Sequence, residues 1–515
     1  MTRPALDYPE VPVGAILAGA ARRFGDRTAF RHHDDELTFS RLWTQACRFA
    51  NGLVGRGVRP GDRVALVMPN CLAFPVAYYG LLLAGATFVP VNPLMPEPAV
   101  RAQIEDAEAK VVLKAADVAT VGQGQPDTPP DVEIDIHHHL AHLAYTGGTT
   151  GLSKGVRLPH RNVVVNTLQF ACWQTGGVPA LDDEGGLVLN QVNDPGEYRA
   201  RVGAGVAINL TPWFHAMGTI AGLNVTILAG TSVVLHDRFD PVAYLADAEK
   251  RQVTYVGGAP ALFAGLLACP AIHTTDLSSV TGIGSGAAPM PMEMTRALQR
   301  LMPKAVIVEG YGLTEVTMGA ASSPVAVSAT RKVGTVGLPV FDTEIKVVPV
   351  EGGEEPLPAG ERGEVCIRGP QVMLGYHNRP ADTADVLVDG WLHTGDIGVL
   401  DADGYLSIVD RKKDMLIYKG YNVYPRELEE LLVAHPGVVM AAVVGRKSVE
   451  VGELPVAFVV PARPDVTAEQ LMADINAKVV PYKRLREVIL TDQIPVSAAG
   501  KILKRELRQL LLESS

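Results

Sequence analysis

Hydrophobic and polar positions in the first part of the chain alternate between helical and strand patterns. From Ser40, apolar residues recur on one face of a predicted helix that Ser40 would cap and Gly57 would end (Leu42, Trp43, Ala46, Phe49, Ala50 and Leu53). The continuous apolar run at 64–68 suits a strand buried on both faces. Helices at 72–83 and 100–109 and strands at 87–91 and 111–113 follow. This alternation, which continues to about residue 406, predicts an α/β fold with doubly wound parallel sheets.

The last hundred residues have a different pattern. A helix is predicted from Pro425, with Leu428, Leu431 and Leu432 on one face, followed by strands at 438–444 and 456–460. Thr467 and Gln470 then form a capping-box pattern ahead of another amphipathic helix. We therefore predict a large N-terminal domain, 1–410, and a small mobile α+β C-terminal domain, 411–515, with the boundary in the charged run 410–414.

Length and composition narrow the class of protein. A chain of 515 residues is too long for one core, and 47% hydrophobic with 20% charged residues is typical of a globular protein. The net charge of −10 argues against nucleic acid or an anionic membrane as the main partner. Five scattered cysteines without CxxC spacing argue against a disulfide framework and a zinc site, and favour the cytoplasm. Neither an export signal nor a membrane-spanning segment is expected.

Two segments fit no periodic pattern. The polar stretch 181–201 is interpreted as an inserted loop or a small hairpin. The histidines at 137–139, with His142 nearby, could bind a metal, but no acidic or cysteine partner stands at ligand spacing. A position at the edge of a strand is the favoured interpretation.

The stretch YTGGTTGLSKG, residues 145–155, has the composition of a phosphate-binding loop. Its glycines allow close backbone approach, its threonines supply hydroxyl donors, and Lys154 supplies a positive charge. It differs from the common phosphate loop, because Leu152 and Ser153 separate Gly151 from the lysine. A flexible surface loop is the alternative.

Three further stretches carry groups suited to a nucleotide. In EGYGLTE, glycines flank Tyr311, which can support a flat ring, and Glu315 can bind Mg²⁺; the alternative is a tight turn. The small residues of GSGAAP, 284–289, follow an apolar strand, where open α/β sheets bind ligands. Asp396 can accept both hydroxyls of a ribose, or can simply form a turn after Gly395.

Lys501 stands at the start of a helix predicted for 502–511, after the flexible Ser497-Ala498-Ala499-Gly500. A cation there opposes the helix dipole, so helix stability does not explain the lysine. A lysine on a mobile loop can neutralise charge that develops at a carboxylate–phosphate reaction centre.

Seven motifs in register resemble the adenylate-forming superfamily, which includes acyl-CoA synthetases and aryl-CoA ligases. They are YTGGTTGLSKG, PWFHAMG, GSGAAPMP, EGYGLTE, HTGD, DRKKDMLIYKGYNVYPRELE and PVSAAGKILKREL, and they cover nearly the whole chain. The resemblance implies that ATP and a carboxylic acid give an acyl-adenylate and pyrophosphate. The acyl group then passes to a thiol after the small domain rotates.

The resemblance also implies residue roles. Thr146, Gly147, Gly148, Thr149, Thr150 and Lys154 would hold the β- and γ-phosphates, and Gly286, Ala287, Ala288 and Tyr311 would bracket the adenine. Thr314 would lie near the α-phosphate, Glu315 would bind Mg²⁺, Asp396 and Arg411 would bind the ribose, and Lys501 would serve the adenylation step. Lys413 would be the pivot and Gly420 would flank the pantetheine channel. Ser153 departs from the family's usual proline, and the 181–201 stretch is longer than is common.

The residues predicted to line the substrate pocket limit the class of carboxylic acid that the protein could activate. They are Phe214, His215, Gly258, Gly284, Gly310 and Val316. Members that activate α-amino acids carry an Asp in the motif aligned with Phe214-His215, and none is present here. Small apolar walls would leave a tunnel, so a medium- to long-chain fatty acid is the first expectation. A cinnamate- or benzoate-like aryl acid remains open.

The sequence gives less information about the thiol that accepts the acyl group and about partner proteins. Arg446, Lys447, Lys483 and Arg484 suit the phosphates of CoA, or form a solvated face, and the phosphopantetheine of an acyl carrier protein remains an alternative acceptor. A homodimer is possible. A non-catalytic nucleotide-binding homologue is a further alternative, although such proteins typically lose Lys501 or Glu315, and both are present.

Overall fold

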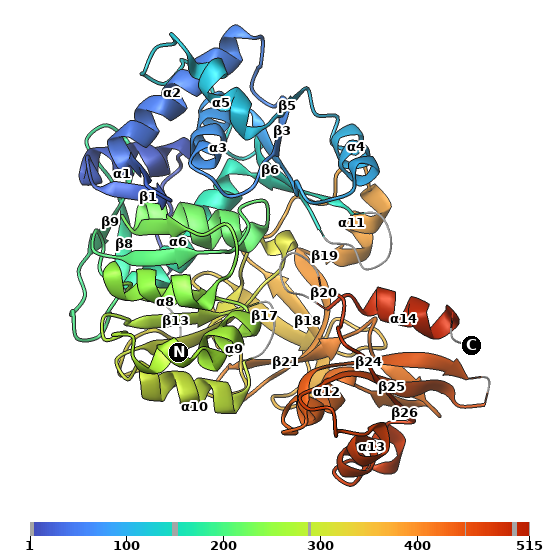
Figure 1. The fold of residues 1–515 in the computed structure, drawn as a ribbon. Coiled ribbons are helices and arrows are strands. Elements are labelled where there is room, and N and C mark those ends of the chain that lie inside the picture. The colour runs from blue at the N-terminus through green and yellow to red at the C-terminus, as the bar shows by residue number, and fades with distance from the viewer. Residues whose placement is uncertain (1–4, 147–152, 287–289, 449, 497–501, 514–515) are drawn as a thin grey trace. The chain divides into compact units, whose positions relative to one another are not determined.

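The structure, a computed structural model, describes residues 5–146, 153–286, 290–448, 450–496 and 502–513. The chain divides into two compact units (Figure 1). Unit 1 comprises the described residues up to Glu344 together with Arg368–Leu392, and unit 2 comprises Ile345–Ile367 together with the described residues from His393 onward. The helices in the described part of the chain include none long and apolar enough to span a membrane.

Unit 1 contains a five-stranded sheet with the strand order β5-β3-β4-β6-β7. Its pairs are parallel except for β6 with β7, which is antiparallel. The apolar run predicted at 64–68 forms β3, and β4 and β5 have the predicted bounds. The strands are β3 (Arg63–Val67), β4 (Thr87–Val91), β5 (Val111–Leu113), β6 (Leu140–Tyr145) and β7 (Gly155–Pro159).

A nine-stranded sheet, also in unit 1, has the order β16-β15-β14-β13-β12-β10-β11-β1-β2. The pairs from β14 to β1 are parallel, and the outer pairs are antiparallel. The doubly wound α/β architecture predicted from the sequence is therefore confirmed. The strands are β1 (Thr28–His32), β2 (Asp35–Thr38), β10 (Val206–Asn209), β11 (Ser232–Leu235), β12 (Tyr255–Gly258), β13 (Gly282–Ser285), β14 (Val306–Tyr311), β15 (Ala321–Ser322) and β16 (Leu338–Pro339).

Helices cover the faces of these sheets. One face of the nine-stranded sheet packs against α8, α9 and α10 through a cluster that includes Val256, Ile283, Phe263 and Leu298 (Figure 1). A larger cluster joins α1, α2, α3 and α6 to both sheets. The helices and short helical turns of unit 1 are α1 (Gly14–Phe24), α2 (Phe39–Gly55), α3 (Ala73–Leu83), α4 (Glu97–Asp106), α5 (Ala115–Gly122), α6 (His160–Thr175), η1 (Gly218–Val225), α7 (Thr226–Leu228), α8 (Pro241–Lys250), α9 (Pro260–Ala268), η2 (Pro270–His273), α10 (Met292–Leu301), η3 (Thr314–Val316) and α11 (Pro380–Val386).

Several helix starts differ from the prediction. The helix predicted at 100–109 is α4, which begins three residues earlier, at Glu97, and α3 begins one residue after the predicted 72. The N-cap of α2 is Thr38, whose hydroxyl accepts from the Arg41 backbone N–H at 3.2 Å, and Ser40 already lies within the helix. Phe39 is fully buried, and its burial fixes the earlier start. The helix predicted from 502 begins at Lys504 instead, because Ile502 pairs with Val496 in an extended bridge.

The polar insertion begins as a hairpin, so the second of the two interpretations holds for its first part. β8 (Gly177–Leu181) and β9 (Leu187–Gln191) pair in register as an isolated two-stranded sheet. Arg22 of α1 binds the Asp182 carboxylate with two bonds of 2.7 and 2.8 Å. Such a bidentate pair fixes the hairpin tip against α1.

Unit 2 is built mainly from the C-terminal residues. One of its sheets has the order β23-β22-β25-β24, with β26 paired to β25, and Leu428, Leu471 and Val443 lie in the buried core beside it. A different sheet contains β17, β18, β20 and β21, in which β18 lies between β17 and β20 and β21 pairs with β20. The elements of the C-terminal region are β17 (Glu344–Val348), β18 (Arg362–Arg368), β20 (Trp391–Leu400), β21 (Leu406–Arg411), β22 (Leu416–Tyr418), β23 (Tyr421–Val423), α12 (Pro425–Val433), β24 (Val438–Ser448), β25 (Gly452–Pro461), α13 (Ala468–Asn476), η4 (Pro481–Lys483), β26 (Glu487–Leu490) and α14 (Lys504–Glu513).

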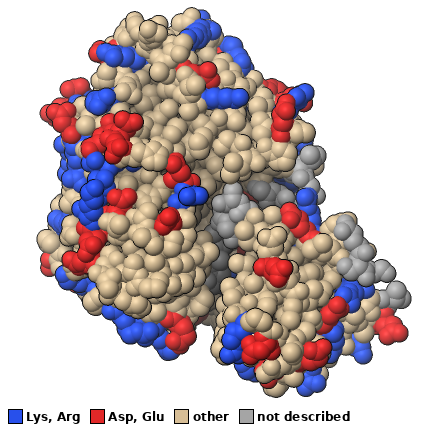
Figure 2. Space-filling view, in the orientation of Figure 1, with Lys and Arg blue, Asp and Glu red and all other residues tan. Residues whose placement is uncertain are grey.

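The local predictions for unit 2 are largely confirmed. The Thr467 hydroxyl accepts from the Gln470 backbone N–H at the start of α13, as its capping pattern predicts. Figure 2 shows acidic and basic side chains interspersed over the visible surface of the molecule.

Candidate active site

The candidate phosphate loop connects two antiparallel strands. Tyr145, at the end of β6, pairs with Gly155, at the start of β7, and the Thr146 backbone N–H donates to the Lys154 carbonyl at 3.1 Å. The two ends of the loop are therefore held together. Of its predicted phosphate-binding residues, Thr146 and Lys154 are described, whereas Gly147, Gly148, Thr149 and Thr150 lie outside the described residues.

The Lys154 ammonium group has two neighbours in unit 1. Its Nζ lies 2.7 Å from a carboxylate oxygen of Asp382, on α11, and 4.9 Å from the centroid of the Tyr376 ring. About a third of each charged side chain is exposed, 32% for Lys154 and 36% for Asp382. A pair this exposed contributes at most about 1 kcal/mol. Lys154 can therefore leave Asp382 for a phosphate at small cost.

Glu315 lies in the single helical turn η3, directly after β14. Its Oε1 accepts a hydrogen bond from the Tyr376 hydroxyl at 2.8 Å. Burial and the neighbouring Glu315 charge raise the pKa of Tyr376, so the phenol stays protonated and donates. The ring of Tyr376 thus links the two predicted residues, with Lys154 over its face and Glu315 at its hydroxyl.

A strained backbone turn closely follows Glu315 in the chain. Thr317 has φ 69° and ψ −53°, and the Met318 N–H donates to the Val316 carbonyl at 2.8 Å, which defines a strained γ-turn. A β-branched residue rarely adopts this conformation, and strained residues cluster at functional sites. The buried Thr317 hydroxyl donates to the Gln371 carbonyl at 2.8 Å and secures the turn.

The sequence analysis did not identify Tyr376, Asp382 or Thr317. Tyr376 lies 61 residues from Glu315, and Asp382 lies 228 residues from Lys154. Residues 374–377 also run beside β7, since the His377 N–H donates to the Gly155 carbonyl at 2.7 Å.

The candidate adenine-binding residues lie at the ends of adjacent strands. Ser285 of β13 pairs with Glu309 of β14, which places Gly286 and Tyr311 at the same sheet edge. A Cβ built at Gly286 would lie 3.3 Å from the Met217 sulfur, so the PWFHAMG segment reaches this edge too. Thr314 begins η3 just beyond Tyr311. Ala287 and Ala288 lie outside the described residues.

Tyr255 covers the small residues of β12 and β13. A Cβ would lie 2.8 Å from its ring at Gly257 and 3.0 Å at Gly282, and one at Gly284 would overlap its hydroxyl oxygen. Burial raises the pKa of Tyr255 to about 12. Because residues two apart in a strand share a face, the ring lies on the face opposite Val256 and Ile283, which pack against the helices.

The other substrate-pocket candidates lie in varied surroundings. Gly258 faces α9, since a Cβ there would lie 3.2 Å from Leu262. Val316 is fully buried, Phe214 is half-buried, and Gly310 and His215 are exposed. Space next to Gly258 and Gly284 is therefore occupied by Leu262 and Tyr255, and a tunnel does not follow from these two glycines.

Unit 2 carries the candidate ribose-binding residues. Asp396 of β20 and Arg411 of β21 face each other in register, and the Arg411 Nε lies 3.2 Å from an Asp396 oxygen. The Asp396 side chain is only 8% exposed. Two antiparallel strands thus hold a carboxylate, which can accept hydrogen bonds from the hydroxyls of a sugar, next to a guanidinium group, which can donate them.

The predicted pivot and acceptor residues follow β21. Lys413 lies exposed in the turn after β21, and the Asp410 carboxylate accepts from the Arg411 and Arg426 backbone N–H groups at 2.7 and 2.9 Å. Gly420 has φ 81° and Lys419 has φ 49°, so together they form a tight hairpin turn between β22 and β23. Lys501 lies outside the described residues.

Comparison with known proteins defines the family. The AMP-binding enzyme family matches residues 17–377, and its C-terminal domain family matches residues 427–501. The chain belongs to the AMP-binding enzyme family. The predicted membership of the adenylate-forming superfamily is confirmed, and the chain is by class an AMP-forming acid–CoA ligase.

Individual relatives span nearly the whole chain. It is 33% identical to the long-chain-fatty-acid–CoA ligase of Bacillus subtilis (98% of this chain, 95% of the relative). It is 36% identical to the feruloyl-CoA synthase of an Amycolatopsis species (96% and 98%). A solved structure of o-succinylbenzoate CoA synthetase from Bacillus subtilis with ATP and a magnesium ion matches with a TM-score of 0.79 and 26% identity, over 96% of this chain and 99% of that one.

Proposed function

We propose that the protein activates an apolar carboxylic acid of flat, aryl type and transfers it to CoA. The observation that carries the aryl proposal is the Tyr255 ring lying over Gly257, Gly282 and Gly284. The Tyr255 ring lies against glycines of β12 and β13 and fills space that a long acyl chain would need. Its flat face also offers a surface on which an aromatic substrate ring can stack. The similarity to a feruloyl-CoA synthase agrees with this choice.

A fatty acid is the second candidate. The sequence placed it first because small residues suggested a tunnel, and the relative from Bacillus subtilis acts on long-chain fatty acids. Tyr255 occupies the space next to Gly284 from which the tunnel was inferred. The two acids differ in shape, so a single set of variants at Tyr255 separates them.

The first half-reaction uses residues of unit 1 together with Lys501. Lys154 leaves Asp382 and, with the loop it ends, binds the β- and γ-phosphates of ATP. An oxygen of the acid attacks the α-phosphorus, and the bond to pyrophosphate breaks. Thr314 lies near that phosphate, and Lys501 neutralises the charge that develops. Glu315 fits a magnesium ion, since Tyr376 contacts only its Oε1 and a hard cation prefers carboxylate oxygen.

The second half-reaction uses the other unit. Asp396 and Arg411 hold the ribose, and rotation about Lys413 brings Gly420 to the acyl-adenylate. The thiol sulfur attacks the acyl carbon, and AMP leaves. Exchanging one face of a mobile domain for another lets one site serve both pyrophosphate release and thiol entry.

CoA is the proposed acceptor. Arg446 is paired with Glu487 and Lys483 with Glu427, so these two charges are already neutralised. Lys447 and Arg484 have no ion-pair partner within the described ranges and remain available to phosphates. A carrier protein as acceptor, a homodimer and a cytoplasmic location stay predictions. Thioester formation with CoA or with a phosphopantetheinylated carrier protein decides the acceptor.

The test of the acid is acid-dependent exchange of labelled pyrophosphate into ATP, with cinnamate, benzoate and C8 to C16 fatty acids. The wild type should prefer an aryl acid. Tyr255→Gly should shift the preference towards longer chains by about tenfold or more, because pocket volume is worth roughly 1–3 kcal/mol per methylene. Tyr255→Phe, the matched control, should keep the aryl preference. A wild type that prefers C12 to C16 acids contradicts the proposal.

A further inference from the structure

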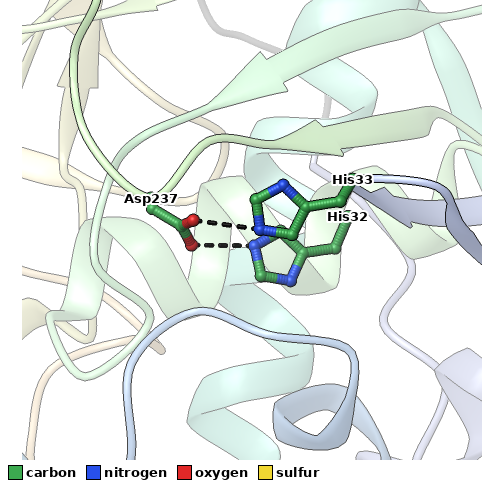
Figure 3. Close-up of side chains that lie close together, drawn as sticks. All are labelled: His32, His33 and Asp237. Carbon is green, nitrogen blue, oxygen red and sulfur yellow. Dashed lines mark hydrogen bonds and ion pairs between the residues drawn. The ribbon is translucent and has the colours of Figure 1, made fainter.

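His32, His33 and Asp237 form a cluster in unit 1, apart from the residues assigned to catalysis (Figure 3). His32 ends β1, and His33 follows it in the turn to β2. β1 runs parallel to β11, with His32 opposite Leu235, so Asp237 lies just beyond the partner strand. Two neighbouring strands of one sheet therefore bring together residues that lie 205 positions apart.

The ligand atoms of the cluster converge. The His32 Nε2 lies 2.8 Å from one Asp237 oxygen, and the His33 Nε2 lies 3.0 Å from the other. Figure 3 shows both rings directed at the carboxylate, and their centroids are 4.2 Å apart with planes inclined by 28°. One nitrogen or oxygen from each residue lies within 4.8 Å of the others.

The facing groups are the ones that bind borderline divalent metals. Neutral imidazole nitrogens and a carboxylate are all electron-pair donors, so without a cation each Nε2 must carry a proton to approach Asp237. A metal ion replaces those protons and satisfies both nitrogens and the carboxylate together. We propose that His32, His33 and Asp237 bind a divalent transition metal of the zinc type, with water in the remaining positions.

Exposure indicates what kind of metal site this is. The side chains are 17% exposed for His32, 69% for His33 and 58% for Asp237. Solvent therefore reaches the ion, and the site is expected to exchange its metal and to bind less tightly than a closed four-ligand structural zinc site. Imidazole favours zinc, nickel, cobalt and copper, whereas magnesium and calcium require more oxygen ligands.

Two charged side chains next to the cluster in the sequence are paired with other residues. Arg31 pairs with Glu36, and the His236 Nε2 pairs with Asp247 at 2.9 Å. In the predicted histidine cluster, Asp135 bonds His138 and its backbone N–H donates to His139. Within the described residues, His32, His33 and Asp237 are the only three such side chains close enough to hold one ion. The sequence argument against zinc concerned cysteine spacing and missed this contact between distant strands.

Metal binding by the full-length chain tests the proposal. After EDTA treatment and buffer exchange, cobalt(II) titration should give ligand-field absorption that saturates near one ion per chain, and zinc should displace the cobalt. Asp237→Asn and His33→Gln should each weaken zinc affinity by about tenfold or more, since even outer-sphere changes cost that much. Zinc should also raise the unfolding temperature of the wild type, and at the same zinc concentration it should raise that of Asp237→Asn by less.

The controls separate this site from other histidines and from misfolding. His138→Gln should bind zinc like the wild type. The metal-free Asp237→Asn chain should unfold at nearly the wild-type temperature, because the removed charge is exposed. Equal zinc affinity in wild type and Asp237→Asn, or loss of binding in His138→Gln alone, would overturn the proposal. With magnesium supplied and zinc absent, Asp237→Asn and His33→Gln should exchange pyrophosphate at the wild-type rate.

Discussion

Tyr376 is the residue that connects the two candidate catalytic groups of unit 1. Its ring lies under the Lys154 ammonium group and its hydroxyl donates to Glu315. A hydrogen bond to a charged group contributes about 1.5–3 kcal/mol, and this one also orients the proposed metal ligand. In the proposed mechanism Tyr376 is a positioning residue, because its contacts are with Lys154 and Glu315.

Removing that hydroxyl should affect the magnesium dependence of the reaction. We expect Tyr376→Phe to lower kcat/KM for ATP by about tenfold and to raise the magnesium concentration needed for half-maximal rate, because Glu315 loses its donor. Tyr244→Phe is the matched control, since the Tyr244 hydroxyl is buried and has no partner among the described residues. An unchanged magnesium dependence in Tyr376→Phe would contradict the role.

The candidate residues were predictable only where a motif carries them. Lys154 and Glu315 stand in recognisable stretches, and the structure links them. Tyr376, Asp382 and Thr317 act through contacts or strain that no short pattern encodes. Asp237 is similar, because its partners lie on a strand far away in the sequence.

At the scale of single elements, local patterns predicted the buried strands best. β4 and β5 have the predicted bounds because continuous apolar runs between turn residues leave little choice. The start of α2 was misplaced because Thr38 and Ser40 are both good caps, and packing of Phe39 decides between them. The long connection between β17 and β18 has no regular pattern of apolar residues from which its structure could be predicted.

Close contact between elements is testable at Gly19 of α1. A Cβ there would overlap the Leu187 carbonyl of β9, whereas one at Gly55, in the last turn of α2, meets nothing within 4 Å. Gly19→Ala should therefore destabilise by about 1–3 kcal/mol despite better helix propensity. Gly55→Ala should be neutral or stabilising by up to about 1 kcal/mol. Thermal unfolding of both variants measures this, and a Gly19→Ala protein as stable as Gly55→Ala would contradict the packing.

At the scale of the whole molecule, the sequence predicted a large and a small domain and membership of the adenylate-forming superfamily. Unit 2 also includes Ile345–Ile367, a segment that precedes the predicted boundary at 410/411 by many residues. That assignment depends on contacts between distant strands, which periodicity does not reveal. The boundary itself, and the rotation about Lys413, stay predictions.

The rotating-domain account assigns Lys501 to the first half-reaction alone. Replacing it should therefore remove adenylation and leave thioester formation largely intact when acyl-adenylate is supplied. An inactive fold would lose both steps, so the two rates distinguish a specific role from damage.

The most direct measurement is acid-dependent exchange of labelled pyrophosphate into ATP, made on wild type and Lys501→Ala, with thioester formation from synthetic acyl-adenylate and CoA measured beside it. The account predicts exchange by the wild type only when an acid is present. It predicts none by Lys501→Ala, whose thioester formation should stay within about tenfold of the wild type. Wild-type exchange that is absent across a broad acid panel would contradict it. Equal loss of both steps in a Lys501→Ala protein that unfolds at the wild-type temperature would contradict it too.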